Sequence, residues 1–340
     1  MEFLIEYGLF MAKTITVVVA IGIILLMIVA TRRRGREVGE LHVQPMNERF
    51  AHLEHVLKHR VLPKKKFRKE AKAEKARAKK EKKEQQVSDR KRIFVLSFKG
   101  DIRASAVASL REEITAVLSI ASESDEVLLR LENAGGLVHE HGLAASQLTR
   151  IKARGIPITV AVDKVAASGG YMMACVADKI IAAPFAVLGS IGVLAQIPNF
   201  HRLLETHGVE FEQIKAGELK RTLTMFGKNT DEDRARLQEQ IEDTHILFKD
   251  YVAENRPALD MNVVATGEHW HGIRALQHKL VDELLTSDDY LLAAKDEADL
   301  FEITYKHKKD LGERIAGVMQ GMIDKAFVAF ATRLQNERVT

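Results

Sequence analysis

The sequence predicts an α/β fold with a mainly parallel sheet, preceded by an N-terminal transmembrane helix. Strand-like apolar runs alternate with helix-like runs from residue 93 onward, which is typical of repeated β–α units. Two glycine-rich turns follow strand-like runs, and ligands of parallel sheets gather at the carboxyl ends of the strands. Near the N-terminus, 18 consecutive residues carry no charge, which is enough to cross a bilayer.

The uncharged run, residues 14–31, indicates an anchor rather than a cleaved signal peptide, because four arginines follow it closely and only Lys13 precedes it. We therefore expect residues 10–36 to contact membrane lipid. The arginines after the run, Arg32–Arg34 and Arg36, place the rest of the chain on the cytoplasmic side by the positive-inside rule.

Residues 37–92 form a linking region, with an amphipathic stretch up to residue 63 and a Lys/Glu/Ala-rich tether after it. Residues 64–92 contain 15 Lys/Arg and 5 Asp/Glu, whereas the whole chain has a net charge of only +4. A basic tether joined to an acidic body argues against a nucleic-acid-binding fold. Two interpretations of the tether stay open, attraction to anionic headgroups and a solvated spacer.

The body is predicted to begin at residue 93, with residues 93–300 as one domain and 301–340 as a C-terminal strand and amphipathic helix. The expected strands are residues 93–98, 126–131 and 157–162, and the expected helices are residues 104–120, the segment ending near 152, and residues 231–251. A second apolar stretch, residues 180–198, is interrupted by proline, glycine and glutamine. It is interpreted as core and not as a second span.

Ser168 lies among small residues at a predicted strand-to-helix turn, with Gly169 after it. Such a serine has an unobstructed hydroxyl, and the following glycine lets backbone N–H groups approach a developing oxyanion. Taken without further context, Ser168 is better explained as the N-cap of the following helix, a role that serine favours. The turn at Gly135 and Gly136 ends the previous strand and is by itself only a turn.

A nucleophilic serine needs a base, and the histidine pairs in HEH (139–141) and HWH (269–271) offer no third metal ligand. We interpret them as surface or packing histidines in loops. Lys220 could act as a base only if desolvation removed its proton, which spacing cannot show. Cys175, the single cysteine, lies in an apolar run and is expected to be buried.

Four segments together resemble the signal peptide peptidase A family of serine proteases. They cover roughly residues 93–285 and read LLRLENAGGLVHEHGLAASQL, VDKVAASGGYMMACVADKIIAAPFAVLGSIGV, AGELKRTLTMFGKNT and ATGEHWHGIRALQHKLVDEL. The resemblance implies a Clp-protease/crotonase-like fold and a bacterial inner-membrane protease without cofactor or metal. It also implies a homo-oligomeric ring in which neighbouring subunits supply serine and lysine, acting on peptide or protein substrates.

Mapped by motif, the resemblance makes Ser168 the nucleophile and Lys220 the general base. The oxyanion donors become the N–H groups of Gly169 and of the Gly135–Gly136 turn, and Ser190 would help to hold the lysine. The family usually reads Ser-Pro-Gly-Gly at the first turn, where this chain has Asn133-Ala134-Gly135-Gly136.

Two alternative functions and one alternative membrane orientation stay open at this point. A crotonase-type acyl-CoA enzyme would use the same glycine turns without a serine–lysine pair. A non-catalytic membrane scaffold would keep the fold alone. Related proteases are commonly placed with the catalytic domain outside the cytoplasm, which opposes the orientation that the arginine flank predicts.

Overall fold

The computed structural model describes residues 14, 39–73, 90–217 and 223–307. The chain divides into two compact units, His42–Thr304 and a second unit made of Met1–Leu41 with Tyr305–Thr340. Most of the second unit lies outside the described residues, including all but Thr14 of the predicted anchor and the whole predicted C-terminal helix. In the described part of the chain, no helix has the length and apolar character needed to cross a bilayer.

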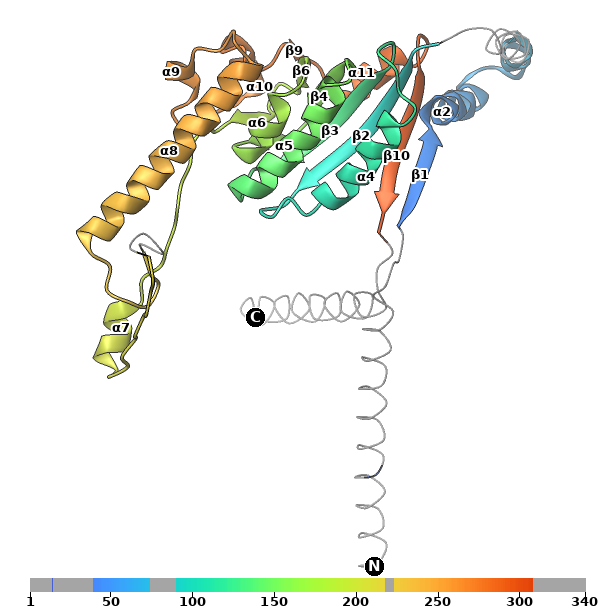
Figure 1. Cartoon of the computed structure of the whole chain (residues 1–340). Helices are drawn as coiled ribbons and strands as arrows, with labels where there is room; N and C mark the ends of the chain where they lie inside the picture. Colours follow the sequence, from blue (N-terminus) through green and yellow to red (C-terminus); the bar gives the residue numbers. More distant parts are fainter. Residues whose placement is uncertain (1–13, 15–38, 74–89, 218–222, 308–340) are drawn as a thin grey trace, which may run out of the picture. The chain divides into compact units, whose positions relative to one another are not determined.

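The central sheet confirms the predicted α/β architecture with mainly parallel pairing (Figure 1). Its strand order is β1-β10-β2-β3-β4-β6-β9, and every register given between β10 and β9 is parallel. The strands are β1 (Glu40–Pro45), β2 (Arg92–Gly100), β3 (Glu126–Asn133), β4 (Ile158–Val162), β6 (Lys179–Ala182), β9 (Glu283–Leu284) and β10 (Asp299–Lys306).

A short branch leaves the main sheet at the carboxyl end of β3. β5 (Val165–Ala167) pairs in parallel with β3 and β7 (Val187–Gly189), and β8 (His269–His271) pairs antiparallel with β7. The sequence predicted only a turn at residues 166–170, because a three-residue strand is too short to show an alternating pattern. The branch brings the carboxyl ends of β3, β5 and β7 next to one another.

Alternate residues of the strands face two different cores, as the pleat requires. Phe94 and Leu96 of β2 belong to the larger core, which also includes residues of α4 (Val107–Leu118), α5 (Val138–Lys152) and α6 (Gly169–Ala174). Ile93 and Val95 belong to a smaller core with residues of α2 (Met46–Val61) and α11 (Ser287–Ala294). The sheet is therefore covered by helices on both faces.

The predicted strands and helices of the body agree with β2, β3, β4, α4, α5 and α8 (Asp231–Asn255), apart from a few terminal residues. The remaining short helices are α7 (His201–Thr206), α9 (Met261–Val264) and α10 (Gly272–Gln277). The predicted division at residue 300 falls inside β10, whose first residues pair with β2.

The expectation that residues 180–198 are core is wrong for the end of that stretch, residues 192–198. Ile180, Ile181 and Leu188 are buried, but Leu194 is 76% exposed. After β7 the chain leaves the sheet and enters an arm, described over residues 193–217 and 223–230, which carries α7 away from the sheet in Figure 1. No described residue of this arm is buried.

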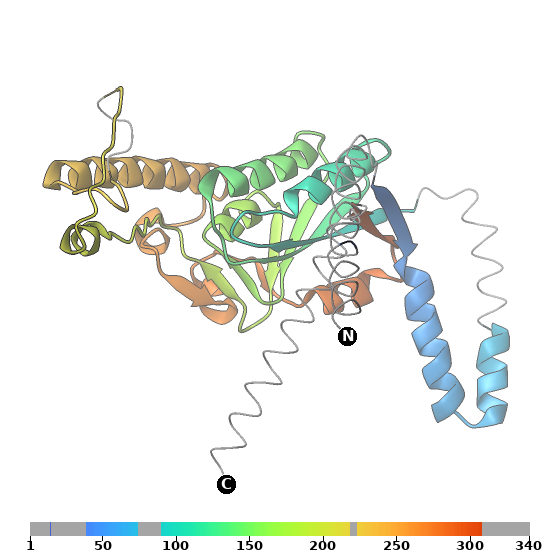
Figure 2. The ribbon, with the colours of Figure 1, turned by 90° about the horizontal axis from the view of Figure 1, so that it is seen from below.

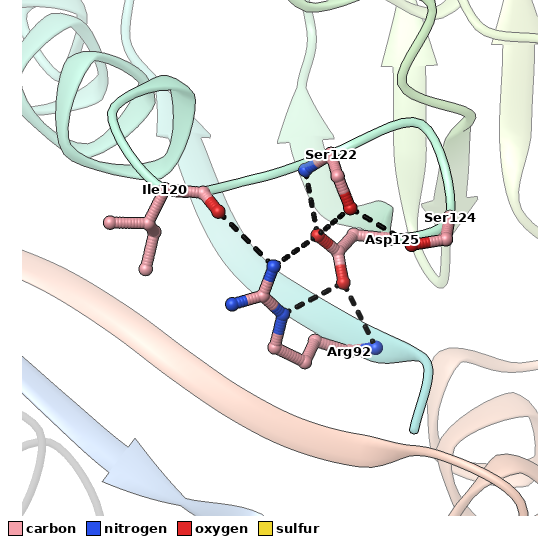
Figure 3. Close-up of polar contacts among 5 residues, drawn as sticks. All are labelled: Arg92, Ile120, Ser122, Ser124 and Asp125. Carbon is pink, nitrogen blue, oxygen red and sulfur yellow. Dashed lines mark hydrogen bonds and ion pairs between the residues drawn. The ribbon is translucent and has the colours of Figure 1, made fainter. Parts of the chain in front are cut away.

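The amino ends of β2 and β3 are joined by a dense polar cluster (Figure 3). Arg92 donates from Nε to Asp125 Oδ1 at 2.8 Å and from Nη2 to Asp125 Oδ2 at 2.5 Å. The backbone N–H of Ser122 donates to the same carboxylate at 2.7 Å. Burial alone would raise the pKa of Asp125, but the hydrogen bonds from Arg92 and Ser122 outweigh it and lower the pKa to about 2.

Candidate active site

Ser168 links the end of β5 to the start of α6 in a strained backbone conformation. Its φ is 53° and its ψ is −119°, a region that non-glycine residues rarely adopt. Ser168 N donates to Gly189 O at 2.7 Å, and Ser168 O accepts from Met172 N at 3.0 Å. Its side chain makes no hydrogen bond that caps α6. The N-cap explanation for this serine therefore lacks its defining bond, and the backbone is held while the hydroxyl is not used by the helix.

The first glycine turn lies directly against Ser168. Gly135 has a φ of 92°, and a Cβ added there would lie 2.8 Å from Ser168 Cβ and 2.9 Å from Gly169 N. A Cβ on Gly136 would lie 2.1 Å from Ile102 O, so that glycine is required by the neighbouring backbone. The structure thus brings together the four residues that the sequence analysis combined as nucleophile and oxyanion donors.

The three glycine amides of this cluster differ in their hydrogen bonding. Gly135 N donates to Asn133 Oδ1 at 2.9 Å. The N–H groups of Gly136 and Gly169 have no acceptor among the residues that the structure describes. Unengaged amides in the two glycine turns that adjoin Ser168 are the kind of donor that an oxyanion requires. Gly136 and Gly169 are therefore better donor candidates than Gly135.

Asn133, the last residue of β3, is 1% exposed and contacts several of the residues around it. Its Oδ1 accepts the Gly135 N–H and lies 3.2 Å from His141 Nε2, while Nδ2 faces Met173 Sδ at 3.4 Å. The His141 ring packs against Gly169, where an added Cβ would lie 2.4 Å from His141 Cγ. Asn133 therefore links the turn at Gly135 to the helix that follows it.

The histidine pairs lie on regular elements, and the prediction that they lie in loops is wrong. His141 is fully buried on α5, as a packing histidine should be, with Nδ1 3.0 Å from Leu137 O, whereas His139 is exposed. His269 and His271 lie on β8 with exposed side chains. The described residues contain no group of three or more potential metal ligands. A polar residue ending β3 and a histidine eight positions later were the available signal for the Asn133–His141 contact.

Ser190 follows β7 as Ser168 follows β5. Because Ala167 is in register with Gly189, the two serines stand one step beyond matched positions of neighbouring parallel strands. Ser190 also has a positive φ, 51°, and its N–H donates to Glu268 O at 2.6 Å. Two strained serines at adjacent strand ends are a local feature that indicates function.

Helix α6, which positions Ser168, is buried along its whole length. The Tyr171 hydroxyl donates to Leu280 O at 2.9 Å, and burial raises the pKa of this phenol. Cys175 is fully buried as predicted, and burial raises the pKa of its thiol to about 12. A thiol in that state is a poor nucleophile, so the serine is the stronger candidate on this helix.

Lys220, the predicted base, lies outside the described residues. The described residues that flank it, Gly217 and Leu223, belong to the arm. The structure therefore gives no distance between Ser168 and Lys220.

Comparison with known proteins covers nearly the whole chain. Residues 2–148 match the family described as peptidase family S49 N-terminal, and residues 150–301 match peptidase family S49. A Haemophilus influenzae protein named "Probable protease SohB" is 48% identical over 321 residues, which is 91% of this chain and 91% of that protein. A Buchnera aphidicola protein of the same name is 54% identical over 227 residues, covering 67% of this chain and 68% of that protein.

Among solved structures, the membrane-bound stomatin-specific protease 1510-N, in complex with a substrate peptide, matches with a TM-score of 0.44 at 14% identity. That match covers 67% of this chain and 99% of the other. A ClpP1 variant from Listeria monocytogenes matches with a TM-score of 0.37 at 14% identity, covering 59% of this chain and 94% of the other.

Proposed function

The chain belongs to peptidase family S49, and from this premise we propose that it is a membrane-anchored serine endopeptidase with a Ser168–Lys220 dyad. Family membership confirms the resemblance predicted from the sequence and makes the chain a peptidase. The residue roles, the anchor and the assembly described below are the proposal.

The conformation of Ser168 is the single observation that carries the assignment of the nucleophile. Its backbone is strained, its hydroxyl does not cap α6, and two amides without an acceptor among the described residues lie in the adjoining turns. Strain of this kind costs on the order of 1–3 kcal/mol and persists where the surroundings impose it. A merely structural N-cap serine would have an extended backbone and a bond to the first turn of its helix.

In the proposed reaction, Lys220 accepts the Ser168 hydroxyl proton and Ser168 Oγ attacks the peptide carbonyl carbon. The negative charge that develops on the carbonyl oxygen is stabilised by the N–H groups of Gly136 and Gly169. The peptide C–N bond then breaks, and the protonated lysine returns a proton to the leaving amine. Water, deprotonated by the same lysine, hydrolyses the acyl-enzyme.

The lysine must be neutral to act as a base, which requires desolvation of its ammonium group. We propose that a second copy of the chain provides this desolvation in a homo-oligomeric ring. The exposed apolar residues of the arm support this proposal, since a monomer would leave them in water. They include Leu194 (76% exposed), Leu203, Val209, Phe211 and Ile214 (97% exposed).

Ser190 is proposed to orient the amino group of Lys220, because the end of its strand adjoins that of Ser168. Residues 14–31 are proposed as a single-pass anchor in the bacterial inner membrane, with residues 10–36 in contact with lipid. The expected substrates are membrane-derived or unfolded peptides, as the resemblance to the signal peptide peptidase A family implies. The mechanism requires no metal or cofactor.

The test is hydrolysis of a panel of unstructured apolar peptides by the detergent-solubilised chain, measured beside Ser168→Ala and Lys220→Ala. We expect both variants to lose cleavage while they assemble as the unchanged chain does. Co-assembly of the two variants should restore part of the activity, because some sites then combine an intact serine with a neighbour's intact lysine. Equal cleavage by all three proteins would refute the dyad, and no cleavage by any would favour the scaffold.

A further inference from the structure

Helix α2 carries one apolar stripe that begins in the body of the protein and continues beyond it. Met46, Phe50, Leu53, Leu57 and Val61 recur at spacings of three and four residues, which places them on one side of the helix. Met46 is 3% exposed and Phe50 packs against the smaller core. Further along, Leu53 is 56% exposed, Leu57 65% and Val61 68%. The same stripe is therefore buried at its start and exposed to solvent at its end.

The start of α2 is fixed to the body by Asn47 in its first turn and by Phe50 in the next turn. Asn47 Nδ2 donates to Lys295 O at 2.8 Å and to Ala298 O at 3.0 Å, and Asn47 Oδ1 accepts from Leu300 N at 2.7 Å. Figure 2 shows the remainder of α2 leading away from the sheet. The fixed first turn sets the direction in which the bare part of the stripe faces.

The segment that follows α2 covers a different side of this helix. The Phe67 ring lies 5.3 Å from the His55 ring and 5.0 Å from the His59 ring, measured between centroids. At 100° per residue, His55 lies about 180° around the helix from Met46. The contact with Phe67 therefore leaves the stripe open.

The surroundings of the stripe are basic. Residues 46–73 contain nine Lys/Arg and three Asp/Glu, whereas residues 90–307 contain 25 Lys/Arg and 32 Asp/Glu. Arg49 and Arg60 stand along one border of the stripe by helical position. On the other border, Lys58 forms an ion pair with Glu54 at 2.6 Å. An apolar stripe with basic side chains along one border matches the surface of an anionic bilayer, in which apolar acyl chains lie beneath anionic headgroups.

We propose that Leu53, Leu57 and Val61 insert between the headgroups of an anionic lipid bilayer, so that α2 lies in the membrane interface. Burial of three large aliphatic side chains supplies the apolar part, and Arg49 and Arg60 beside the stripe supply attraction to anionic headgroups. This inference rests on one part of the proposed function, the membrane anchor, which brings α2 near the bilayer. Residues 32–45 can extend at most about 50 Å, so α2 stays close to the membrane.

The test uses a fluorescent probe attached to the full chain reconstituted in lipid nanodiscs. Leu57→Cys carries the polarity-sensitive dye NBD on the stripe, and Ala51→Cys carries it on another, exposed side of the helix as the matched control. The native Cys175 is fully buried with a raised thiol pKa, so labelling selects the introduced cysteine. Both variants also carry Ser168→Ala, so the readout does not depend on peptidase activity.

We expect the emission of the dye at position 57 to shift to the blue as phosphatidylglycerol replaces phosphatidylcholine, and to shift back in high salt. The dye at position 51 should not change, and Arg49→Glu with Arg60→Glu should reduce the shift at position 57. Identical emission at the two positions in all lipids would overturn the proposal. A shift at position 57 that ignores lipid composition but weakens on protein dilution would assign the stripe to a second copy, which also overturns it.

Discussion

The two ends of the central sheet are built in opposite ways. At the amino ends of β2 and β3, the Asp125 carboxylate is saturated by Arg92 and Ser122 (Figure 3). At the carboxyl ends of β3, β5 and β7, two serines have positive φ, and two glycine amides have no acceptor among the described residues. Satisfied polar groups stabilise the fold, whereas unsatisfied and strained groups are available for chemistry.

This difference between the two ends shows how a strained backbone can persist at the carboxyl ends of the strands. β2 and β3 pair over eight registered residues, from Ile93 with Glu126 to Gly100 with Asn133, so the two ends share one rigid ladder. The pairing fixes where Asn133 stands, and Asn133 in turn holds Gly135. Changes at the carboxyl end should therefore reduce catalysis with modest effects on folding, and changes at the amino end should do the reverse.

Among changes at the two ends of the sheet, Gly135→Ala is expected to have the largest effect, a loss of kcat. The φ of 92° and the 2.8 Å approach to Ser168 Cβ mean that a methyl group displaces the nucleophile or the turn. We expect kcat to fall by about 10²–10³-fold, the loss typical of a damaged oxyanion site. Steady-state peptide hydrolysis measures it.

Gly155→Ala is the matched control for backbone strain. Gly155 also has a positive φ, 69°, but its added Cβ would meet the Glu123 side chain, away from Ser168. This variant should lose stability and keep its kcat. An equal loss of kcat in both variants would show that general destabilisation, and not the geometry at Ser168, limits the rate.

The next effect is expected from Asn133→Ala, which removes the acceptor of the Gly135 N–H. The Gly135 N–H is only part-buried, so leaving it unpaired costs about 1 kcal/mol of stability, but a displaced turn moves the adjoining donors. We expect kcat to fall by about 10–100-fold with KM little changed. Asn133→Ser keeps a side-chain oxygen at the turn and should retain more activity. If serine and alanine lose kcat equally, the side-chain oxygen has no positioning role.

At the amino end, Asp125→Asn should leave kcat unchanged and reduce stability. The folded-state pKa of about 2 lies below the ordinary value of 3.8, so the carboxylate stabilises the fold above pH 3.8 and that contribution is lost as pH falls toward 2. The shift corresponds to about 2 kcal/mol. Denaturant unfolding near neutral pH and at pH 3 should show a difference between parent and variant that narrows in acid. A difference that widens in acid would contradict the assignment.

The smallest effect is expected from Thr159→Val. Thr159 Oγ1 donates to the buried carboxylate of Glu126 at 2.7 Å. In the variant this carboxylate would still accept from the Lys91 ammonium group, at 2.6 Å, and from the Tyr290 hydroxyl. Losing one of three donors should cost about 1 kcal/mol of unfolding free energy without altering hydrolysis. A measurable loss of kcat in this variant would show that the two ends of the sheet are coupled.

Much of the fold could be predicted because long elements carry a repeated pattern. The runs that became β2, β3 and β4 have β-branched and apolar residues over five or more positions, and α8 begins at a polar capping sequence around Thr230. The strands β5, β7 and β8 have three residues each, and no periodicity can appear over that length. Those short strands are the ones that shape the candidate site.

Asn133 and His141 show why the rest of the site was missed. The sequence marked Asn133 as a departure from the family pattern and His141 as one of a pair, but gave no reason to join them. Their contact exists because β3 ends where α5 begins, which brings Asn133 Oδ1 to 3.2 Å from His141 Nε2. A hydrogen bond between a strand end and a helix depends on how the two elements pack.

By itself, the sequence determined the α/β class, the order of the long elements, the burial of Cys175 and the residues around which a peptidase site could form. Local pattern decides those features, since periodicity, glycine placement and charge are properties of neighbouring residues. The tertiary structure alone decided that Gly135 touches Ser168, that Ser190 stands at the adjacent strand end, and that Leu194 is exposed on an arm. These facts depend on strand register and on where the chain leaves the sheet, and both are fixed by packing between residues distant in sequence.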